Sequence, residues 1–207
     1  MPETAAARGP FLELFGGVPC LDFANTLDGR ATAHPEEKLT TYADLVGWAR
    51  YAGLIDQPAA ERLAATPPAA ARAALATAVE LREAIFRIFA ALGRGEPVPS
   101  GPLTDLRDRY AEAVAVAVLE PGGAGFDWRF GGDEADRPWW PVAVSAVRLL
   151  TAGPLDRVKV CAAEAGCIGL FLDVSKNRSR RWCNDGCGLE AKIQRQARRR
   201  RLARDGG

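Results

Sequence analysis

The sequence predicts an α+β protein: a mainly helical N-terminal domain with a small β-hairpin, followed by a small cysteine-rich C-terminal module. Apolar residues recur at helical spacing in several segments of the first three quarters of the chain. Residues 113–130 instead alternate around a glycine-rich turn, which is typical of paired strands. Four of the five cysteines fall within residues 161–187. Because Gly153-Pro154 separates the two parts, we expect domains over residues 1–153 and 154–207.

Length and composition limit what the chain can contain. With 207 residues it has room for one medium-sized domain and one small module. Its composition, 48% hydrophobic and 26% charged, is that of a globular protein and excludes a disordered or fibrous chain. The longest uncharged apolar stretch, residues 138–147, is too short to span a bilayer, and residues 1–10 do not resemble a secretory signal. We therefore expect a cytoplasmic protein that does not bind a membrane.

The first predicted elements are a strand or turn over residues 11–17 and a helix that starts within residues 21–27. Thr41 begins the next helix, because Asp44 follows it at the spacing of a capping box. Gly53 ends the apolar periodicity that follows. A capped helix is therefore expected between Thr41 and Gly53.

The longest predicted helix follows Pro67-Pro68 and ends at Gly93. Large apolar residues recur between residues 75 and 92 with a period near the 3.6 residues of a helical turn. A link rich in proline and glycine, residues 93–102, leads to a shorter helix through residues 106–110. Both segments support a mainly helical domain.

A β-hairpin and one more helix complete the predicted N-terminal domain. Residues 113–119 alternate valine with alanine, and residues 126–130 alternate aromatic with polar residues, which predicts two strands. Residues 121–125 supply the turn. The helical period returns over residues 141–150 and stops at Gly153-Pro154.

The formal net charge of +1 conceals two oppositely charged parts. Residues 1–156 contain 14 Lys and Arg against 21 Asp and Glu, a net charge of −7. Residues 157–207 contain 13 against 5, a net charge of +8. This asymmetry suggests that the C-terminal part binds a polyanion. The alternative is a solvated basic tail.

The four clustered cysteines, Cys161, Cys167, Cys183 and Cys187, are spaced C-x5-C-x15-C-x3-C. Each short pair can turn the backbone around one ion, and the long gap suits a hairpin, so four thiolates can complete the tetrahedral shell of Zn²⁺. Disulfides are not expected in a cytosolic chain, and iron–sulfur clusters usually show other spacings. A catalytic zinc normally has a His or carboxylate ligand, yet the only histidine, His34, lies far upstream. The spacing predicts one structural zinc ion.

The sequence does not indicate catalysis. Cys20 is expected to be a small buried core residue rather than a nucleophile, because the chain has no second histidine to activate it. The sequence also contains no phosphate-binding loop, dinucleotide fingerprint or recognisable nucleophile–base pair. We therefore expect no enzymatic activity.

The segments around the cysteines predict a treble-clef-like zinc finger. Residues 168–172 are expected to form a strand, residues 173–179 a turn and residues 180–183 the returning strand. Residues 188–203 lack proline and place apolar residues at i, i+4 and i+8, which predicts a basic helix. Such a finger should fold only with its metal.

Basic side chains gather at the predicted turn and on the predicted helix of this finger. Because Lys and Arg displace condensed counterions from phosphate backbones, we expect DNA as the partner. A solubilising tail, a docking surface for the acidic body and an RNA-binding extension are the alternatives. The predicted nucleic-acid contacts are Lys176, Arg178, Arg180, Arg181, Lys192, Arg195, Arg198 and Arg199.

Two sets of residues carry a resemblance to a known family. In the C-terminal part they are Cys161, Cys167, Leu170–Asp173, Ser175, Asn177, Ser179–Cys183 and Cys187-Gly188, followed by the basic helix. In the N-terminal part they are Leu21–Thr26 and Arg30. With these residues the chain resembles bacterial proteins that combine an N-terminal ABATE domain with a C-terminal CGNR zinc finger. The resemblance implies a stress-induced transcriptional regulator.

The chain departs from the family motif next to its last cysteine. Where the motif reads Cys-Gly-Asn-Arg, this sequence reads Cys187-Gly188-Leu189-Glu190, and the last cysteine pair is one residue tighter than in many members. The zinc ligands are unaffected. If the family's arginine contacts a phosphate, Glu190 replaces attraction with repulsion, and DNA binding is either weakened or carried by Arg195 and Arg198–Arg201.

A small-molecule effector is a second hypothesis. Asn25, Thr26 and Arg30 place polar groups among the apolar residues of the segment 21–27 and could line a pocket. Alternatively, Asn25 and Thr26 cap a helix or close a turn, and Arg30 pairs with an acid. Without nucleic-acid binding, this would be a small-molecule-binding or protein-interaction protein whose zinc finger is purely structural.

A homodimer is a third hypothesis, because Trp128, Trp139 and Trp140 could support an interface that doubles the basic surface. Aromatic residues at helical or strand spacing more often belong to the core.

Overall fold

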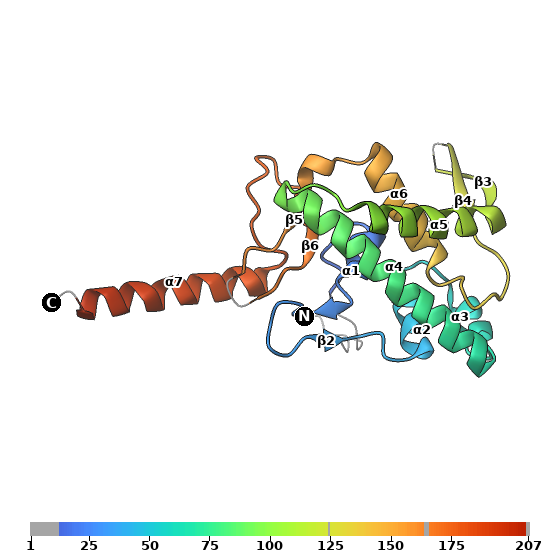
Figure 1. Ribbon diagram of the computed structural model, residues 1–207, viewed down its shortest axis with the longest axis horizontal. Helices are drawn as coiled ribbons and strands as arrows, with labels where there is room; N and C mark the ends of the chain where they lie inside the picture. Colours follow the sequence, from blue (N-terminus) through green and yellow to red (C-terminus); the bar gives the residue numbers. More distant parts are fainter. Residues whose placement is uncertain (1–12, 124, 164–165, 206–207) are drawn as a thin grey trace, which may run out of the picture.

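The computed structural model describes residues 13–123, 125–163 and 166–205, and in it a helical body is joined to one projecting helix, α7 (Figure 1). The helices of the body are α1 (Pro19–Ala24), α2 (Tyr42–Tyr51), α3 (Gln57–Leu63), α4 (Pro68–Arg94), α5 (Ser100–Val116) and α6 (Trp140–Ala152). α4 packs against α1 and α5, and α6 packs against the same two helices. The prediction of a mainly helical body is confirmed. The short helix α3 was not predicted.

Helix α2 begins as its sequence predicts. The Thr41 hydroxyl accepts a hydrogen bond from the Asp44 N–H at 3.2 Å, and the Asp44 carboxylate accepts one from the Thr41 N–H at 2.7 Å. These two bonds satisfy amide groups that a helix N-terminus otherwise leaves without partners. At the other end, Gly53 has a φ of 71°, a left-handed conformation that glycine adopts at little cost.

Helix α4 continues past Gly93, where the sequence predicted its end, and is capped by Gly95 with a φ of 70°. Gly93 is needed for a different reason. A Cβ atom at this position would lie 3.1 Å from the Val160 side chain and 3.2 Å from its backbone nitrogen. Gly93 therefore lets α4 pack closely against the strand that contains Val160.

The β-hairpin is formed by β3 (Val118–Gly122) and β4 (Gly125–Arg129), paired antiparallel. The first strand was predicted to begin at Ala113, and this part of the prediction is wrong, because residues 113–116 belong to α5. Ala113 is fully buried, Leu106 and Pro102 on the same helix are also buried, and the spacing of the three is helical. The alternation of valine with alanine in residues 113–119 therefore does not distinguish a helix from a strand.

The C-terminal part begins with the short helix η1 (Leu155–Arg157). It continues with β5 (Val158–Val160), β6 (Leu170–Leu172) and α7 (Asp185–Asp205). β5 and β6 pair antiparallel, with Val158 opposite Leu172. The strand predicted over residues 180–183 is not formed. The hairpin of the finger instead uses residues that precede Cys161.

Both edges of β6 are already occupied, which explains this difference. One edge pairs with β5. On the other edge, the Leu172 N–H donates to the Gly16 carbonyl at 2.9 Å, and Leu170 exchanges two hydrogen bonds of 2.8 and 2.9 Å with the Asn25 side-chain amide. Residues 180–183 therefore have no free edge of β6 to pair with.

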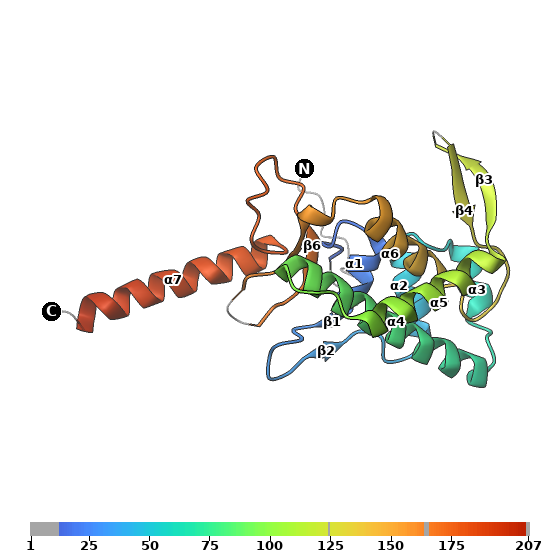
Figure 2. The same ribbon diagram turned by 45° about the horizontal axis from the view of Figure 1, so that its top comes forward.

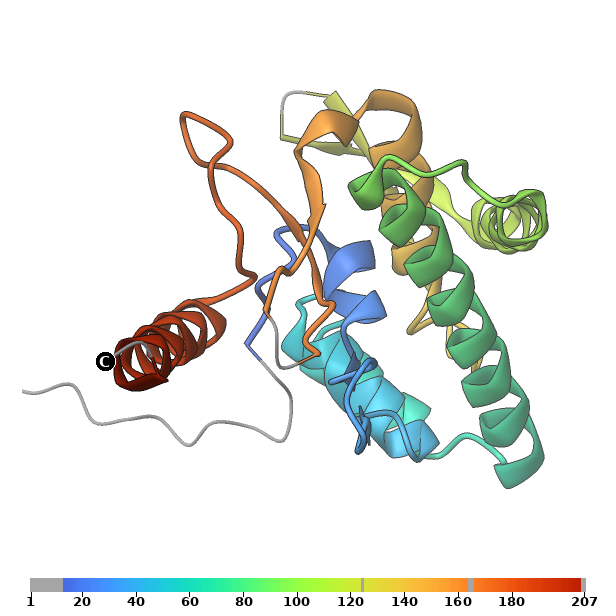
Figure 3. The same cartoon turned by 60° about the vertical axis from the view of Figure 1, so that its left-hand side comes forward.

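The C-terminal strands share the core of the body. Val158, Leu170 and Leu172 are buried in the same apolar cluster as Phe23 and Trp48. Figure 3 looks nearly along α7 and shows β5 and β6 between that helix and α4. A further two-stranded pair, β1 (Leu27–Asp28) with β2 (Glu36–Glu37), was not predicted. Among the described residues, no helix is both long and apolar enough to cross a membrane.

Candidate metal centre and basic surface

The four clustered cysteines come together at the start of α7. Their Sγ atoms all lie within 4.8 Å of one another, and the Cys167–Cys183 and Cys183–Cys187 pairs are 3.6 Å apart. Zn–S bonds of about 2.3 Å in a tetrahedron place sulfur atoms roughly 3.8 Å apart. The spacing of the thiols thus suits one structural zinc ion, as the sequence predicted.

Local hydrogen bonds position these cysteines. Cys161 follows β5, and its N–H donates to the Gly169 carbonyl at 2.8 Å, which folds the loop back on itself before β6. The Cys187 N–H donates to the Asn184 side-chain oxygen at 2.9 Å, so that Asn184 caps α7. Cys187 thereby lies in the first turn of α7, where the helix dipole favours a thiolate.

The thiols need a cation to ionise together. Burial, together with the negative charge of neighbouring thiolates, raises the pKa of Cys187 to about 12. A zinc ion removes this obstacle, because a thiol that coordinates it is deprotonated outright. Four sulfur ligands fill the tetrahedral shell and leave no open position for water, so the metal stabilises the fold of the finger.

A buried carboxylate holds the loop that follows β6. Asp173 is fully buried and accepts hydrogen bonds from the Lys159 ammonium at 2.6 Å, the Ser175 N–H at 2.9 Å and the Arg180 N–H at 3.0 Å. Burial alone would raise the pKa of Asp173, but its bonds to Lys159 and Ser175 hold that pKa well below the usual range. This structural role of Asp173 in the finger was not predicted from the sequence.

Two family models match the chain. The model of the ABATE family, with the description "Putative stress-induced transcription regulator", covers residues 17–153. The chain belongs to the ABATE family. In this ABATE protein the CGNR zinc finger matches residues 157–201, which contain all four cysteines of the cluster. Neither description names an enzymatic activity. No curated protein matches the chain.

The basic side chains predicted to contact nucleic acid differ in how free they are. Four are exposed and have no ion pair or hydrogen-bond partner among the described residues: Lys176, Arg181, Lys192 and Arg198. Arg178 pairs with Asp156, and Arg180 donates to the carbonyls of Trp182 and Cys183. The side chain of Arg199 lies outside the described residues.

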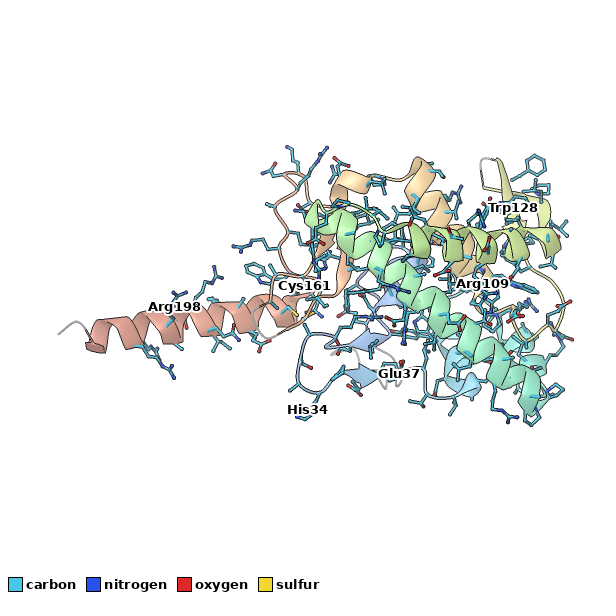
Figure 4. The ribbon with its side chains drawn as sticks, in the orientation of Figure 1. His34, Glu37, Arg109, Trp128, Cys161 and Arg198 are labelled. Atoms are coloured by element: carbon cyan, nitrogen blue, oxygen red, sulfur yellow. The ribbon has the colours of Figure 1, made fainter. Side chains whose placement is uncertain are left out.

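Trp182 organises part of this basic surface, a role that was not predicted from the sequence. The guanidinium groups of Arg181 and Arg195 lie 5.6 and 5.5 Å from the centre of its rings. These contacts are of the cation–π type. The first turns of α7 are thereby attached to the finger through Arg195. Within the described residues, nothing comparable holds Arg198, which Figure 4 shows on the part of α7 beyond the body.

The three residues predicted to bind a small molecule are engaged in internal contacts. Asn25 is bonded to Leu170, the Thr26 hydroxyl donates to the Phe23 carbonyl at 2.8 Å, and Arg30 forms a bidentate ion pair with Glu83. The cavity that touches Asn25 and Thr26 has a volume of about 10 Å³, enough for roughly one water molecule. The effector at these residues stays a prediction that no observation favours.

The remaining predicted residues divide between core and surface. Cys20 is fully buried, which raises the pKa of its thiol to about 12. Trp139 and Trp140 are buried in the core, so of the three tryptophans considered for a dimer only Trp128, 37% exposed, could reach a partner.

Proposed function

We propose that this ABATE-family protein regulates transcription by binding DNA through its zinc finger and helix α7. The observation that carries the proposal is the projection of α7 from the body (Figures 1 and 2). Basic side chains along α7, among them Lys192 and Arg198, are exposed. A zinc ion at the four cysteines would hold the first turn of α7 in place. The finger would then fix the position of the cationic helix α7 relative to the body.

The dimensions of α7 suit a groove of duplex DNA. Its 21 residues give a length of about 31 Å at 1.5 Å per residue, and the major groove admits one α-helix. Arg198, Arg200 and Arg201 are exposed, and rotations of about 100° per residue direct them to different sides of the helix. Such a helix offers cations to the phosphates on both walls of a groove.

The distribution of charge supports the same surface. Residues 157–207 have a net charge of +8, and a zinc ion with four thiolates adds −2, which leaves +6. The preceding residues have a net charge of −7 and would be repelled by DNA. Electrostatics therefore favour approach with the finger and α7 leading.

Fluorescence anisotropy with a labelled duplex would test the proposal. If about five phosphates are engaged, log K should fall against log[salt] with a slope near −4 to −5. The double variant Arg198→Ala/Arg201→Ala should reduce the magnitude of this slope by about 2. The matched control, Arg50→Ala/Arg72→Ala, removes two exposed arginines of the body and should leave the slope unchanged. Absence of binding at low salt would show that the finger is purely structural.

A further inference from the structure

The β3–β4 hairpin projects from the body with an apolar face that the described residues leave uncovered. Leu119 lies opposite Trp128, and Pro121 opposite Phe126, so these four side chains share one face. Phe126 is 67% exposed and Leu119 is 52% exposed. Exposed apolar side chains that lie together in this way mark interaction surfaces.

This apolar face is continuous with the core. Phe130 lies two residues beyond Trp128 and packs against Trp140, with ring centres 6.1 Å apart. Trp128 is 37% exposed, and Phe126, nearer the tip of the hairpin, is 67% exposed. A row of three aromatic side chains thus leads from the core out into solvent, which would anchor a partner at its inner end.

The backbone identifies which edge of the hairpin can accept another strand. Pro121 has no N–H, so the opposed residues Pro121 and Phe126 cannot form a hydrogen-bonded pair, and their backbone polar groups point away from the hairpin. Because hydrogen-bonded and non-hydrogen-bonded pairs alternate along an antiparallel ladder, the backbone polar groups of Leu119 and Trp128 also point away from the hairpin. Proline therefore interrupts the outer edge of β3, whereas Phe126 and Trp128 offer a complete edge on β4. No other described strand pairs with β4.

A groove runs along this edge. It has a volume of about 420 Å³ and is lined by the consecutive residues 126–130, by no residue of β3, and by residues of α6 that include Val144, Val147 and Arg148. One wall is therefore the free edge of β4, and the other is formed by α6 together with Tyr110 of α5. This is the arrangement in which proteins add an extended peptide to a sheet, with main-chain bonds to the strand and side chains in adjacent pockets.

The charge in the groove adds a requirement on the chemistry of the molecule that binds there. Arg148 is exposed and, within the described part of the chain, has no ion-pair or hydrogen-bond partner. Arg129 lies at the strand side, where its only described ion pair is a 3.9 Å contact with Glu120. An acidic group on the occupant would find an unpaired guanidinium at Arg148.

We propose that the groove between β4 and α6 binds an extended, acidic peptide segment of another protein. The peptide forms a third strand on β4, directs alternate apolar side chains toward Trp128 and Val147, and places a carboxylate at Arg148. This site is separate from the finger and α7, which lie at the other end of the molecule (Figure 4).

A second copy of the chain fits this groove less well than a peptide. Pairing of two β4 edges about a twofold axis would bring the α6 helix of each copy against the other copy's hairpin, because α6 forms the second wall of the groove. A twofold axis through Asp127 would also place two carboxylates opposite each other. A single extended chain meets neither obstacle.

A charge exchange tests the side-chain part of the proposal. Random eight-residue peptides displayed on phage would be selected on the full-length protein and on the Arg148→Glu variant. For the wild type, we expect apolar residues at alternate positions and an acid at one fixed position. For Arg148→Glu, the acid should be replaced by Lys or Arg, whereas Arg72→Glu, outside the groove, should select the wild-type pattern. The proposal would be overturned if no peptide were enriched, or if the wild type and Arg148→Glu selected the same pattern.

A pair of proline variants tests the backbone part. Trp128→Pro removes an outward N–H from the β4 edge, and Leu119→Pro removes the equivalent N–H from the opposed residue on β3. A selected peptide, measured by anisotropy, should bind Trp128→Pro at least about tenfold more weakly than Trp128→Ala, which removes only the ring. It should bind Leu119→Pro nearly as well as the wild type. Equal affinities for the two variants contradict strand addition to β4.

N-methylation of the peptide provides the same test without altering the protein. Because alternate amides of an added strand point toward β4, methyl groups at one set of alternate positions should abolish binding and those at the other set should not. Equal effects of the two sets would exclude a strand. A concentration-dependent dimer in analytical ultracentrifugation that Trp128→Pro abolishes would replace the peptide by a second copy and overturn the proposed occupant.

Discussion

Arginine has different surroundings in the body and in the projecting helix. In the body, Arg82 is 2% exposed and bonds to Glu37 at 2.5 and 2.7 Å and to Glu83 at 3.0 Å. In α7, Arg198 is exposed and has no described partner. The same side chain therefore fixes the fold where carboxylates surround it, and remains available to a polyanion where they are absent.

The largest expected effect is that of zinc removal, which should unfold the finger and leave the body folded. Removal of zinc with a strong chelator, or Cys183→Ala, should unfold the finger, because apparent binding energies of structural zinc reach about 10–16 kcal/mol in finger peptides. Limited proteolysis should then cut residues 161–205, while amide exchange in α4 stays slow. Cys20→Ala, which removes the cysteine outside the cluster, is the control for zinc content. Unchanged protease resistance after verified zinc loss would contradict a metal-dependent finger.

Within the body, replacement of the buried Arg82 should lower the free energy of unfolding far more than replacement of an exposed arginine. Arg82→Met leaves Glu37 and Glu83 without their buried partner, so we expect a loss of about 3–5 kcal/mol in the free energy of unfolding. Arg107→Met also removes an ion pair, with Asp108, but this pair is exposed and should cost less than about 1 kcal/mol. Urea denaturation measures both, and similar losses would remove the contrast drawn between buried and exposed arginines.

A pH series should reveal a partly buried acid in the body, Asp22. Burial raises the pKa of Asp22 from 3.8 to about 6, so the folded state binds a proton more tightly than the unfolded chain. The wild type should therefore lose stability as the pH rises from about 4 to above 6. Asp22→Asn should be more stable than the wild type by about 1–3 kcal/mol at pH 8 and equally stable near pH 4.

Urea titrations of the two proteins at each pH would measure this difference, and because both carry the same finger, any effect of pH on zinc binding cancels. A difference that does not change with pH would contradict the raised pKa of Asp22.

The smallest effect concerns Glu190, the residue that departs from the family motif. Its replacement by arginine adds two units of positive charge to an exposed position of α7. We expect DNA affinity to rise about three- to tenfold and the salt slope to steepen by about 1. Glu61→Arg makes the same change on the exposed surface of α3 and should have little effect. Equal gains for both variants would indicate non-specific attraction rather than contact through α7.

The sequence predicted the features that local spacing determines. The Thr41–Asp44 cap, the long helix α4 and the cysteine cluster all follow from residues close to one another in the chain. The absence of a strand over residues 180–183 was not predicted, because the edge of β6 that such a strand would need is occupied by Asn25, which lies 145 residues from Leu170 in the sequence. Arg180 was expected to contact nucleic acid, but its guanidinium donates to the carbonyl groups of Trp182 and Cys183, because residue type and spacing do not show which way a side chain points in a loop.

The attachment of β6 to Gly16 and Asn25 has a consequence for protein engineering. A finger transplanted from another member of the family could take its correct orientation on this body only if its first strand after the metal loop matched these two anchors. Chimeras that exchange residues 154–207 alone would separate Asn25 from the strand with which it forms hydrogen bonds. Functional exchange should therefore require the segment around residues 16–25 to be moved together with the finger.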